Sequence, residues 1–405
     1  MIPIGLDGAH VEPRKEVRWL TPAAVGGLMS ILVLILPWVR GLFVSEGLRW
    51  LYILLFSFAG AFTLTPVMVR VGHRLGLVDQ PTERKIHRDP TPRVGGLAVY
   101  LGFVGSVVIN SILADWMLAI LFAGSLLLVI GIVDDVLELP AWFKLLAQVA
   151  GAGLVISTGK MLTLFPAGPF GGIANVILTL VWIVGITNAF NFFDGMDGLA
   201  TGLAILIAFF LGMVAFQTNQ PGLAWLAAAI IGAGLGFAPY NFRMNHQALI
   251  FLGDSGSTFL GFTLACLAVK GNWADNNPIV SFSSPLLIFG VLVYDMIHIT
   301  VERVVTGKVR TIKDWIDYVG KDHLHHRLER ALGSRRATVA TIFTLNICLG
   351  LAAMVLRKAN TAEALMLLLQ AALIVIIITF LEYRGRPGDR RGMKERPTDV
   401  EATDR

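Results

Sequence analysis

Charged side chains are scarce in this sequence. Asp, Glu, Lys and Arg make up 15% of its 405 residues, whereas about a quarter is usual in soluble proteins. Hydrophobic residues make up 55%, and the mean hydropathy is +0.69. This composition excludes a soluble domain of any size and indicates an integral membrane protein.

Cysteine is scarce as well. The two cysteines, Cys266 and Cys348, both fall in apolar runs, and we interpret them as small core or lipid-facing residues. A disulfide framework and a cysteine-based metal site are thereby excluded. The apolar run near the N-terminus, residues 20–39, is longer than the core of a signal peptide and is followed by no clear small-x-small cleavage site. We therefore expect it to remain as a membrane helix.

Long apolar runs dominate the remaining sequence. A run of about 20 residues is needed to cross a bilayer as a helix. These runs predict an all-α, polytopic integral membrane protein with 11 or 12 transmembrane helices. The candidate runs are 20–39, 48–71, 94–113, 115–133, 142–158, 173–191, 198–217, 223–240, 255–271, 281–304, 337–356 and 362–383.

The basic residues lie mainly in alternate loops between these runs. With a cytoplasmic N-terminus, the loops that follow every second helix are cytoplasmic, and they hold most of the lysines and arginines, as the positive-inside rule requires. Every acidic or histidine-rich cluster lies in the same loops. We therefore predict one cytoplasmic catalytic face, built from the segments 72–93, 134–141, 192–197, 241–254 and 305–336.

The segment NAFNFFDGMDGLAT, residues 188–201, carries the most regular polar pattern. Asn188, Asn191, Asp194 and Asp197 recur at every third residue, a spacing that places them roughly on one side of a helical turn. Gly195 and Gly198 between them allow a ligand to approach the backbone. Such side chains at the end of a membrane helix are costly unless they face water, a metal or each other.

A pair of adjacent carboxylates, Asp134 and Asp135, directly follows an apolar run, with Glu138 and Lys144 shortly after. Adjacent carboxylates repel each other unless a cation or a phosphate-bound metal lies near. Prenyltransferases use a similar DDxxE pattern to bind diphosphate through Mg²⁺. Asp254, in the sequence GDSGS at the start of a helix, is a further candidate Mg²⁺ ligand.

Basic and histidine side chains complete the clusters. Arg84 and Lys85 lie in a loop that ends in two glycines at a helix start, which suits phosphate but also fits ordinary positive-inside charge. Three histidines could bind zinc, but no further ligand spacing supports a closed site; histidines and arginine can instead bind phosphate oxygens or donate protons. This histidine cluster consists of His323, His325, His326 and Arg327. Together the clusters suit phosphoryl transfer to or from a lipid.

The chain resembles the polyprenyl-phosphate N-acetylhexosamine-1-phosphate transferases, which begin the synthesis of teichoic acid, O-antigen or enterobacterial common antigen. Phospho-MurNAc-pentapeptide translocases are related. The resemblance covers residues from about 50 to 356 and rests on five motifs in order: DxPxxRKxHxxPxPRxGG, DDxxE, NxxNxxDGxDGLA, FxGDSGS and HxHHRL. The sequences PTPRVGG and HLHHRL are similar to the GlcNAc-1-phosphate branch. Gln247 replaces the proline that this family has before the GD motif.

The resemblance implies transfer of a sugar 1-phosphate, most simply GlcNAc-1-phosphate, from a UDP-N-acetylhexosamine to undecaprenyl phosphate, with release of UMP and a requirement for Mg²⁺ or Mn²⁺. Asn191 and Asp254 would be the metal ligands. Groups implied to act catalytically are Asp134, Asp135, Lys144, His323, His325 and His326. Groups implied to bind substrate are Arg84, Lys85, Asn188, Asp194, Gly195, Asp197, Arg303 and Arg327, with Gly195 and Asp197 at the uracil and Lys144 and Arg303 at the diphosphate.

The resemblance also divides the chain into parts. An extra N-terminal transmembrane helix (1–47) precedes a transferase core (48–356), and an extra C-terminal helix (357–383) is followed by a charged tail (384–405) that we expect to be disordered. We expect a bacterial cytoplasmic membrane protein that has no nucleic-acid partner. A homodimer is left open.

Two further points are left open. We favour direct attack by the lipid phosphate, because a phosphate monoester is largely dianionic at pH 7 and needs little general base; a covalent aspartyl-phosphate route is the alternative. The alternative functions are a phospho-MurNAc-pentapeptide translocase-like enzyme, a Mg²⁺-dependent membrane prenyltransferase and, outside the enzymes, a secondary transporter.

Overall fold

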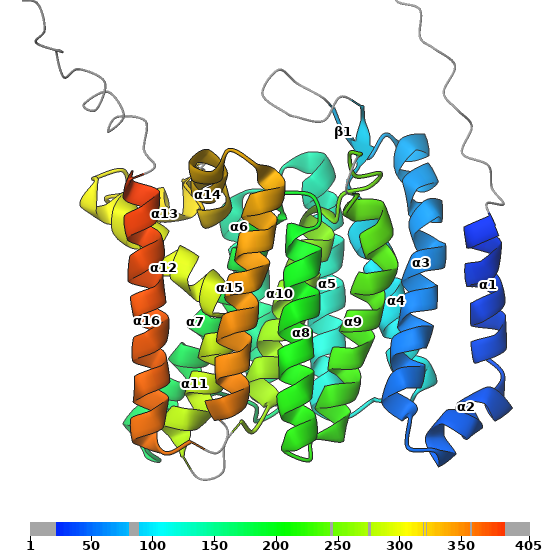
Figure 1. Cartoon of the computed structure of the whole chain (residues 1–405), viewed down its shortest axis with the longest axis horizontal. Coiled ribbons are helices and arrows are strands. Elements are labelled where there is room, and N and C mark those ends of the chain that lie inside the picture. The colour runs from blue at the N-terminus through cyan, green and yellow to red at the C-terminus, as the bar shows by residue number, and fades with distance from the viewer. Residues whose placement is uncertain are drawn as a thin grey trace, which may run out of the picture.

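The computed structural model shows a bundle of helices that run roughly parallel to one another (Figure 1). It describes residues 22–384 except 81–88, 244–245, 274–276, 319, 321 and 357–358. Arg84, Lys85 and the predicted disordered tail after residue 384 therefore lie outside the described residues. The first half of the bundle contains α1 (Pro22–Leu34), α2 (Pro37–Ser45), α3 (Arg49–Leu75), α4 (Gly95–Ile109), α5 (Asp115–Leu137), α6 (Ala141–Ser157), α7 (Pro169–Phe192) and α8 (Leu199–Gln217).

The second half contains the remaining longer helices and two short ones, α13 and α14. These elements are α9 (Pro221–Asn241), α10 (Gly253–Lys270), α11 (Pro278–Ile288), α12 (Gly290–Val305), α13 (Ile312–Asp317), α14 (Leu324–Leu332), α15 (Arg335–Leu356) and α16 (Thr361–Arg384). A 3₁₀ turn, η1 (Phe193–Gly195), follows α7, and a small antiparallel pair joins β1 (Val78–Asp79) to β2 (Thr91–Pro92). The prediction of an all-α membrane protein is confirmed.

Each of the twelve predicted runs is helical over most of its described length, but two are not single straight helices. The run 20–39 bends by 72° between α1 and α2, just before Pro37, and the run 281–304 bends by 83° between α11 and α12. Among the described residues, seven helices are long and apolar enough to cross a membrane, or up to nine if each bent pair forms one span. The runs 94–113 and 142–158 correspond to shorter apolar helices, Gly95–Ile109 and Ala141–Ser157. The two bends were not predicted, because hydropathy records apolar length and not direction.

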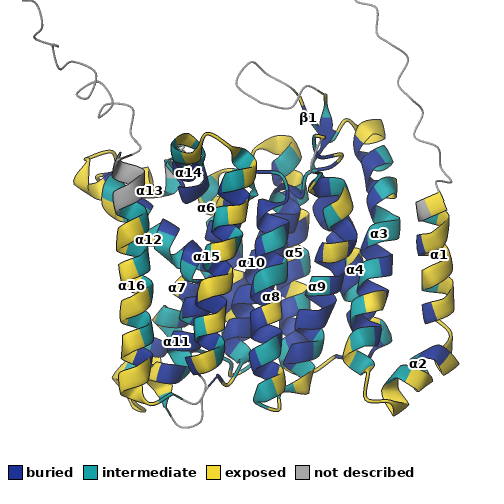
Figure 2. Cartoon of the chain, in the orientation of Figure 1, coloured by how far each residue is buried: buried dark blue, intermediate teal, exposed yellow. Residues whose placement is uncertain are grey.

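Helix α10 lies inside the bundle, where it packs against α4, α5, α7 and α8. All but three of its 18 residues are buried. Figure 2 shows buried residues concentrated in these inner helices, whereas α1 and α16 expose much of their surface at the edges. Because the surrounding helices enclose α10, its first residues, Gly253 and Asp254, are held at the centre of one face of the molecule.

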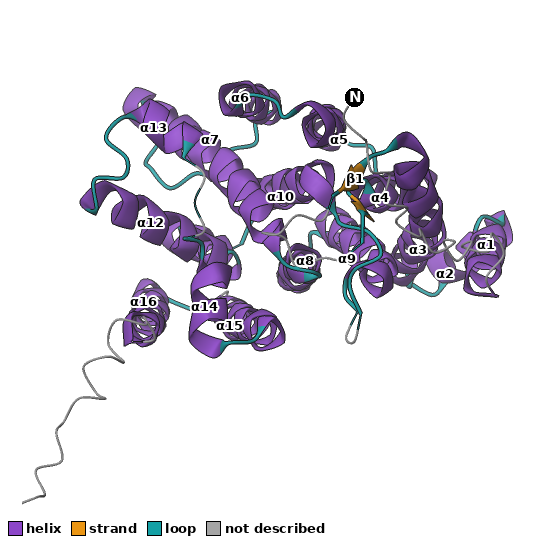
Figure 3. Ribbon diagram, turned by 90° about the horizontal axis from the view of Figure 1, so that it is seen from above, coloured by secondary structure: helices purple, strands orange, loops and turns teal. Residues whose placement is uncertain are grey.

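That face also carries the β1–β2 pair, α13 and α14. Seen from above, β1 lies near α4, and α14 lies beside α15 (Figure 3). The prediction that the loops with acidic residues and histidines share one face is confirmed by this arrangement. The first and last helices pack on the rest through α3 and through α11 and α15 respectively, and their separation from a transferase core stays a prediction.

Candidate active site

A cavity of about 650 Å³ opens on this face at the ends of α5, α7 and α10. The DGMDG loop, the start of α10 and α14 all contribute to its wall. Six of the residues singled out from the sequence line it: Asp135, Asp194, Gly195, Asp197, Asp254 and His326. Segments from four separate motifs therefore meet in one pocket, as predicted.

Asp134 and Lys144 form the core of a charged cluster beside this pocket. The Lys144 ammonium donates to the Asp134 carboxylate at 2.6 Å and lies 3.8 Å from the Asp254 carboxylate. Asp134 also accepts a hydrogen bond from the Leu139 backbone at 2.7 Å, because the chain turns through a left-handed conformation at Glu138. The turn after α5 thus brings the lysine of α6 back over both carboxylates.

Asp135 faces the first turn of α10. Its Oδ1 accepts a long hydrogen bond, 3.4 Å, from the Asp254 backbone amide, and its buried Oδ2 has no hydrogen-bond partner among the described residues. The contact requires the two backbones to approach closely. A Cβ on Gly131 of α5 would lie 2.4 Å from the Cα of Ser255, so only glycine fits there.

Asn191 lies at the end of α7, next to the same turn of α10. Its amide donates to the Ser257 hydroxyl at 3.1 Å, and that hydroxyl in turn donates to the Gly253 carbonyl. Asp254 directly follows Gly253 in that turn. The two predicted metal ligands, Asn191 and Asp254, are therefore neighbours. Within the described part of the chain, no group of three or more His, Cys, Asp or Glu side chains could enclose a metal ion.

Asn188 and Asp197 have protein partners that the sequence pattern did not indicate. Asn188 donates to Gln148 of α6 at 2.6 Å, so this side chain joins α6 to α7. The Asp197 carboxylate accepts from the Ala248 backbone at 3.1 Å, which ties the DGMDG loop to the segment before α10. Of the four regularly spaced polar residues, Asn188 therefore joins two helices, whereas Asp194 and Asp197 line the pocket.

The histidines lie on the aromatic end of α7. The ring of His323 lies 4.6 Å from that of Phe192, and the ring of His325 lies 5.5 Å from that of Phe193. His325 is buried, and neither of its ring nitrogens has a hydrogen-bond partner among the described residues. Burial lowers the pKa of His325 well below its ordinary value, and the charges of His326 and His323 lower it further. His325 is therefore neutral at pH 7.

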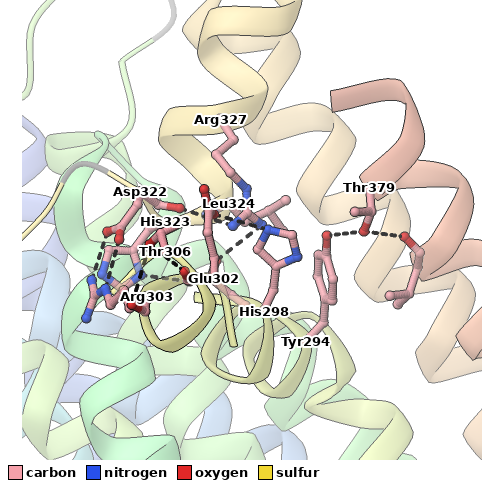
Figure 4. Close-up of polar contacts among 12 residues, drawn as sticks. Tyr294, His298, Glu302, Arg303, Thr306, Asp322, His323, Leu324, Arg327 and Thr379 are labelled. Atoms are coloured by element: carbon pink, nitrogen blue, oxygen red, sulfur yellow. Dashed lines mark hydrogen bonds and ion pairs between the residues drawn. The ribbon is translucent and has the colours of Figure 1, made fainter. Parts of the chain in front are cut away.

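Arg303 does not extend freely into the pocket in this structure. Its guanidinium donates two hydrogen bonds of 2.8 Å to the Asp322 carboxylate (Figure 4). It also lies over the ring of Tyr318. Burial alone raises the pKa of Asp322, but the hydrogen bonds and charge of Arg303 outweigh it and lower that pKa overall. Such a two-pronged pair fixes both partners. Arg303 therefore anchors the segment before the histidines.

Several residues of the site escaped the reasoning from sequence. Arg93 lines the cavity and pairs with Asp79 of β1; its position two residues before the pair of glycines was the available signal. Glu329, Arg330 and Arg335 also line the cavity, as does Gln247, which the sequence marked only as a departure from the family pattern. Gln148 lies within an apolar helix, and only its polarity there could have marked it.

Comparison with known proteins extends these observations. Residues 117–272 match the sequence family described as "Glycosyl transferase family 4". This segment runs from α5 to α10 and holds most of the acidic cluster. A probable undecaprenyl-phosphate N-acetylglucosaminyl 1-phosphate transferase of Bacillus subtilis is 34% identical over 327 residues, which is 79% of this chain and 86% of that protein. The chain belongs to the polyprenyl-phosphate N-acetylglucosamine-1-phosphate transferase family.

Other members of the family are similar over most of their length. A decaprenyl-phosphate N-acetylglucosaminephosphotransferase of Mycobacterium tuberculosis is 34% identical over 70% of this chain and 76% of its own. An undecaprenyl-phosphate alpha-N-acetylglucosaminyl 1-phosphate transferase of Escherichia coli is 30% identical over 67% of this chain and 74% of its own length. The resemblance predicted from five motifs is confirmed, and this transferase is a multi-pass membrane protein.

Proposed function

We propose that this transferase moves N-acetylhexosamine 1-phosphate, in the first instance GlcNAc-1-phosphate, from a UDP-sugar to undecaprenyl phosphate and releases UMP. The names of its relatives support the lipid acceptor and the sugar. The observation that carries the proposal is the cluster of Asp134, Lys144 and Asp254 at the end of membrane helices. A cation held between carboxylates at that depth suits a phosphate that arrives on a lipid.

We propose Mg²⁺ as the cofactor, with Mn²⁺ as a substitute, held by Asn191 and Asp254. The donor set fits this ion, because Mg²⁺ takes one or two carboxylates and completes its shell with water and substrate phosphates. The unpartnered Oδ2 of Asp135 is a further oxygen nearby. When bound, Mg²⁺ would neutralise charge on the diphosphate oxygens.

The chain's own groups then position the two substrates. The acceptor phosphate is largely dianionic at pH 7, since its second pKa is about 6, so it requires no strong base. Its oxygen forms a bond to the β-phosphorus of the UDP-sugar, while the bond from that phosphorus to the bridging oxygen breaks and UMP leaves. Lys144 holds phosphate oxygens, and Asp134 holds Lys144. A covalent aspartyl-phosphate route is the alternative, and it would require Asp134 or Asp135 as nucleophile.

The reaction can be tested directly with purified protein. We expect UMP release with undecaprenyl phosphate, Mg²⁺ and UDP-GlcNAc, and none without the lipid or after removal of the metal by EDTA. Release with a different UDP-hexosamine alone would keep the mechanism and change the sugar. Folded protein that releases no UMP from any UDP-sugar would contradict the proposal and favour a prenyltransferase or a secondary transporter.

We also propose that the pocket faces the cytoplasm of a bacterial inner membrane. Lys160 lies in the turn between α6 and α7, and Lys308 lies after α12, so the two residues mark opposite faces of the bundle. In intact cells, a membrane-impermeant maleimide should label Lys160→Cys and not Lys308→Cys. Permeabilised cells should label both variants. The reverse pattern in intact cells would overturn this orientation.

A further inference from the structure

A buried carboxylate lies beneath the histidine segment, outside the pocket. Asp295 belongs to α12, and its side chain is 1% exposed. It does not line the cavity, so it does not reach substrate. A buried carboxylate is costly unless it is paired and hydrogen-bonded, and the partners of Asp295 therefore indicate what it does.

All the partners that the structure gives Asp295 belong to the start of α14. Its Oδ2 lies 2.8 Å from His323 Nδ1, and its Oδ1 accepts the backbone amide of Leu324 at 2.6 Å. The Arg327 guanidinium lies 3.6 Å from Oδ1. His323 is the N-cap residue of α14 but makes no capping hydrogen bond of its own. Asp295, which belongs to α12, caps α14 instead, because its carboxylate accepts the first backbone amide of that helix.

The same contact determines which nitrogen of His323 carries a proton. A carboxylate only accepts hydrogen bonds, so Nδ1 of His323 must donate to it. Nε2, at the other side of the ring, is then the nitrogen left for a ligand, and it donates to phosphate oxygens when the ring is protonated. The ring itself is held against Phe192, which directly follows the proposed metal ligand Asn191.

We infer that Asp295 is a positioning residue of this transferase. It fixes the orientation and the Nδ1 proton of the His323 ring, and it holds the start of α14 through the Leu324 amide. Nε2 of His323 is thereby directed at the diphosphate of the donor. The inference rests on the proposed function for the identity of that ligand. The carboxylate also supports positive charge on His323 when phosphate oxygens bind, because the ring then lies between two anions. Outer partners of this kind commonly affect activity by about 10- to 100-fold.

The variant Asp295→Asn tests this role with little structural change. The amide oxygen can still accept from Leu324, while the amide nitrogen donates to His323 Nδ1 and forces its proton onto Nε2. We expect kcat for UMP release to fall about 10- to 100-fold, with KM for the UDP-sugar changed by less than about threefold. Glu302→Gln, on the same helix and paired with His298, serves as the control and should retain its kcat within about twofold.

A double-mutant cycle separates positioning from a merely structural role. If Asp295 acts through His323, then Asp295→Asn should cost nothing further in kcat once His323→Gln is present. A further loss in the double variant, or a single variant with unchanged kcat, would overturn the inference. The same cycle on the thermal unfolding midpoint provides a readout that needs no activity, and additive effects there would also overturn it. Inactive wild-type protein would instead contradict the proposed function.

Discussion

Asp254→Asn is expected to reduce the rate of UMP release about a hundredfold or more, while the protein stays folded and membrane-inserted. The substitution keeps the size of the side chain and removes its charge. Asp254 lies beside Lys144 and Asn191, and it is one of two proposed Mg²⁺ ligands. Groups that stabilise developing charge in a dry site contribute rate factors of this size.

The control for Asp254→Asn is the same replacement at Asp115, an exposed residue in the first turn of α5. This variant should turn over at the wild-type rate. Initial rates should be measured over a range of Mg²⁺ concentrations, because a lost ligand raises the concentration that the enzyme needs. Near-normal activity of Asp254→Asn at low Mg²⁺ would remove Asp254 from the metal site.

Gly131→Ala is expected to have a comparable effect on activity, although Gly131 contacts no substrate. Its added methyl group would lie 2.6 Å from the Ser255 backbone nitrogen, so α5 and α10 must separate by about 1 Å. That movement shifts Asp134 and Asp135 relative to Asp254. A misplacement of this size can lower a rate about a hundredfold, and overpacking costs about 1–3 kcal/mol of stability.

Gly153→Ala in α6 is the matched control, because its added methyl group meets nothing within 4 Å. It should keep full activity and unfold at the same temperature or slightly higher, since alanine favours the helix. Both glycine variants should be compared by UMP release and by thermal unfolding in detergent. Full activity in Gly131→Ala would show that the spacing of α5 and α10 does not limit catalysis.

The sequence predicted the pocket well where a motif carries its own geometry. Asp134, Asp135 and Lys144 lie in one turn and the helix after it, so their meeting depends on local structure. The prediction that they join Asp254 came from charge distribution and from resemblance, and the structure confirms that they are neighbours. The metal and the substrates of these residues stay predictions until they are measured.

Other features could not be predicted, because they depend on the path of the chain in space. Arg303 was assigned to the diphosphate, but Asp322 holds it in this structure. Asn188 follows the same spacing as Asn191 but pairs with Gln148. Asp295 carries no motif in the sequence, and only its distance to His323 shows its partner. Pairings between distant helices leave no mark in a local pattern.

The enclosure of α10 divides the active site into two parts with different freedom to change. Asp254 stands at the start of α10, whose backbone is held in place by the surrounding helices, so its position relative to the other site residues is fixed. Gln247, on the segment before α10, and Glu329 and Arg330, on the short helix α14, also line the pocket, and none of these side chains is buried in the core of the bundle. An enzyme built this way can change its sugar preference through Gln247, Glu329 and Arg330 while the cluster of Asp134, Lys144 and Asp254 stays the same.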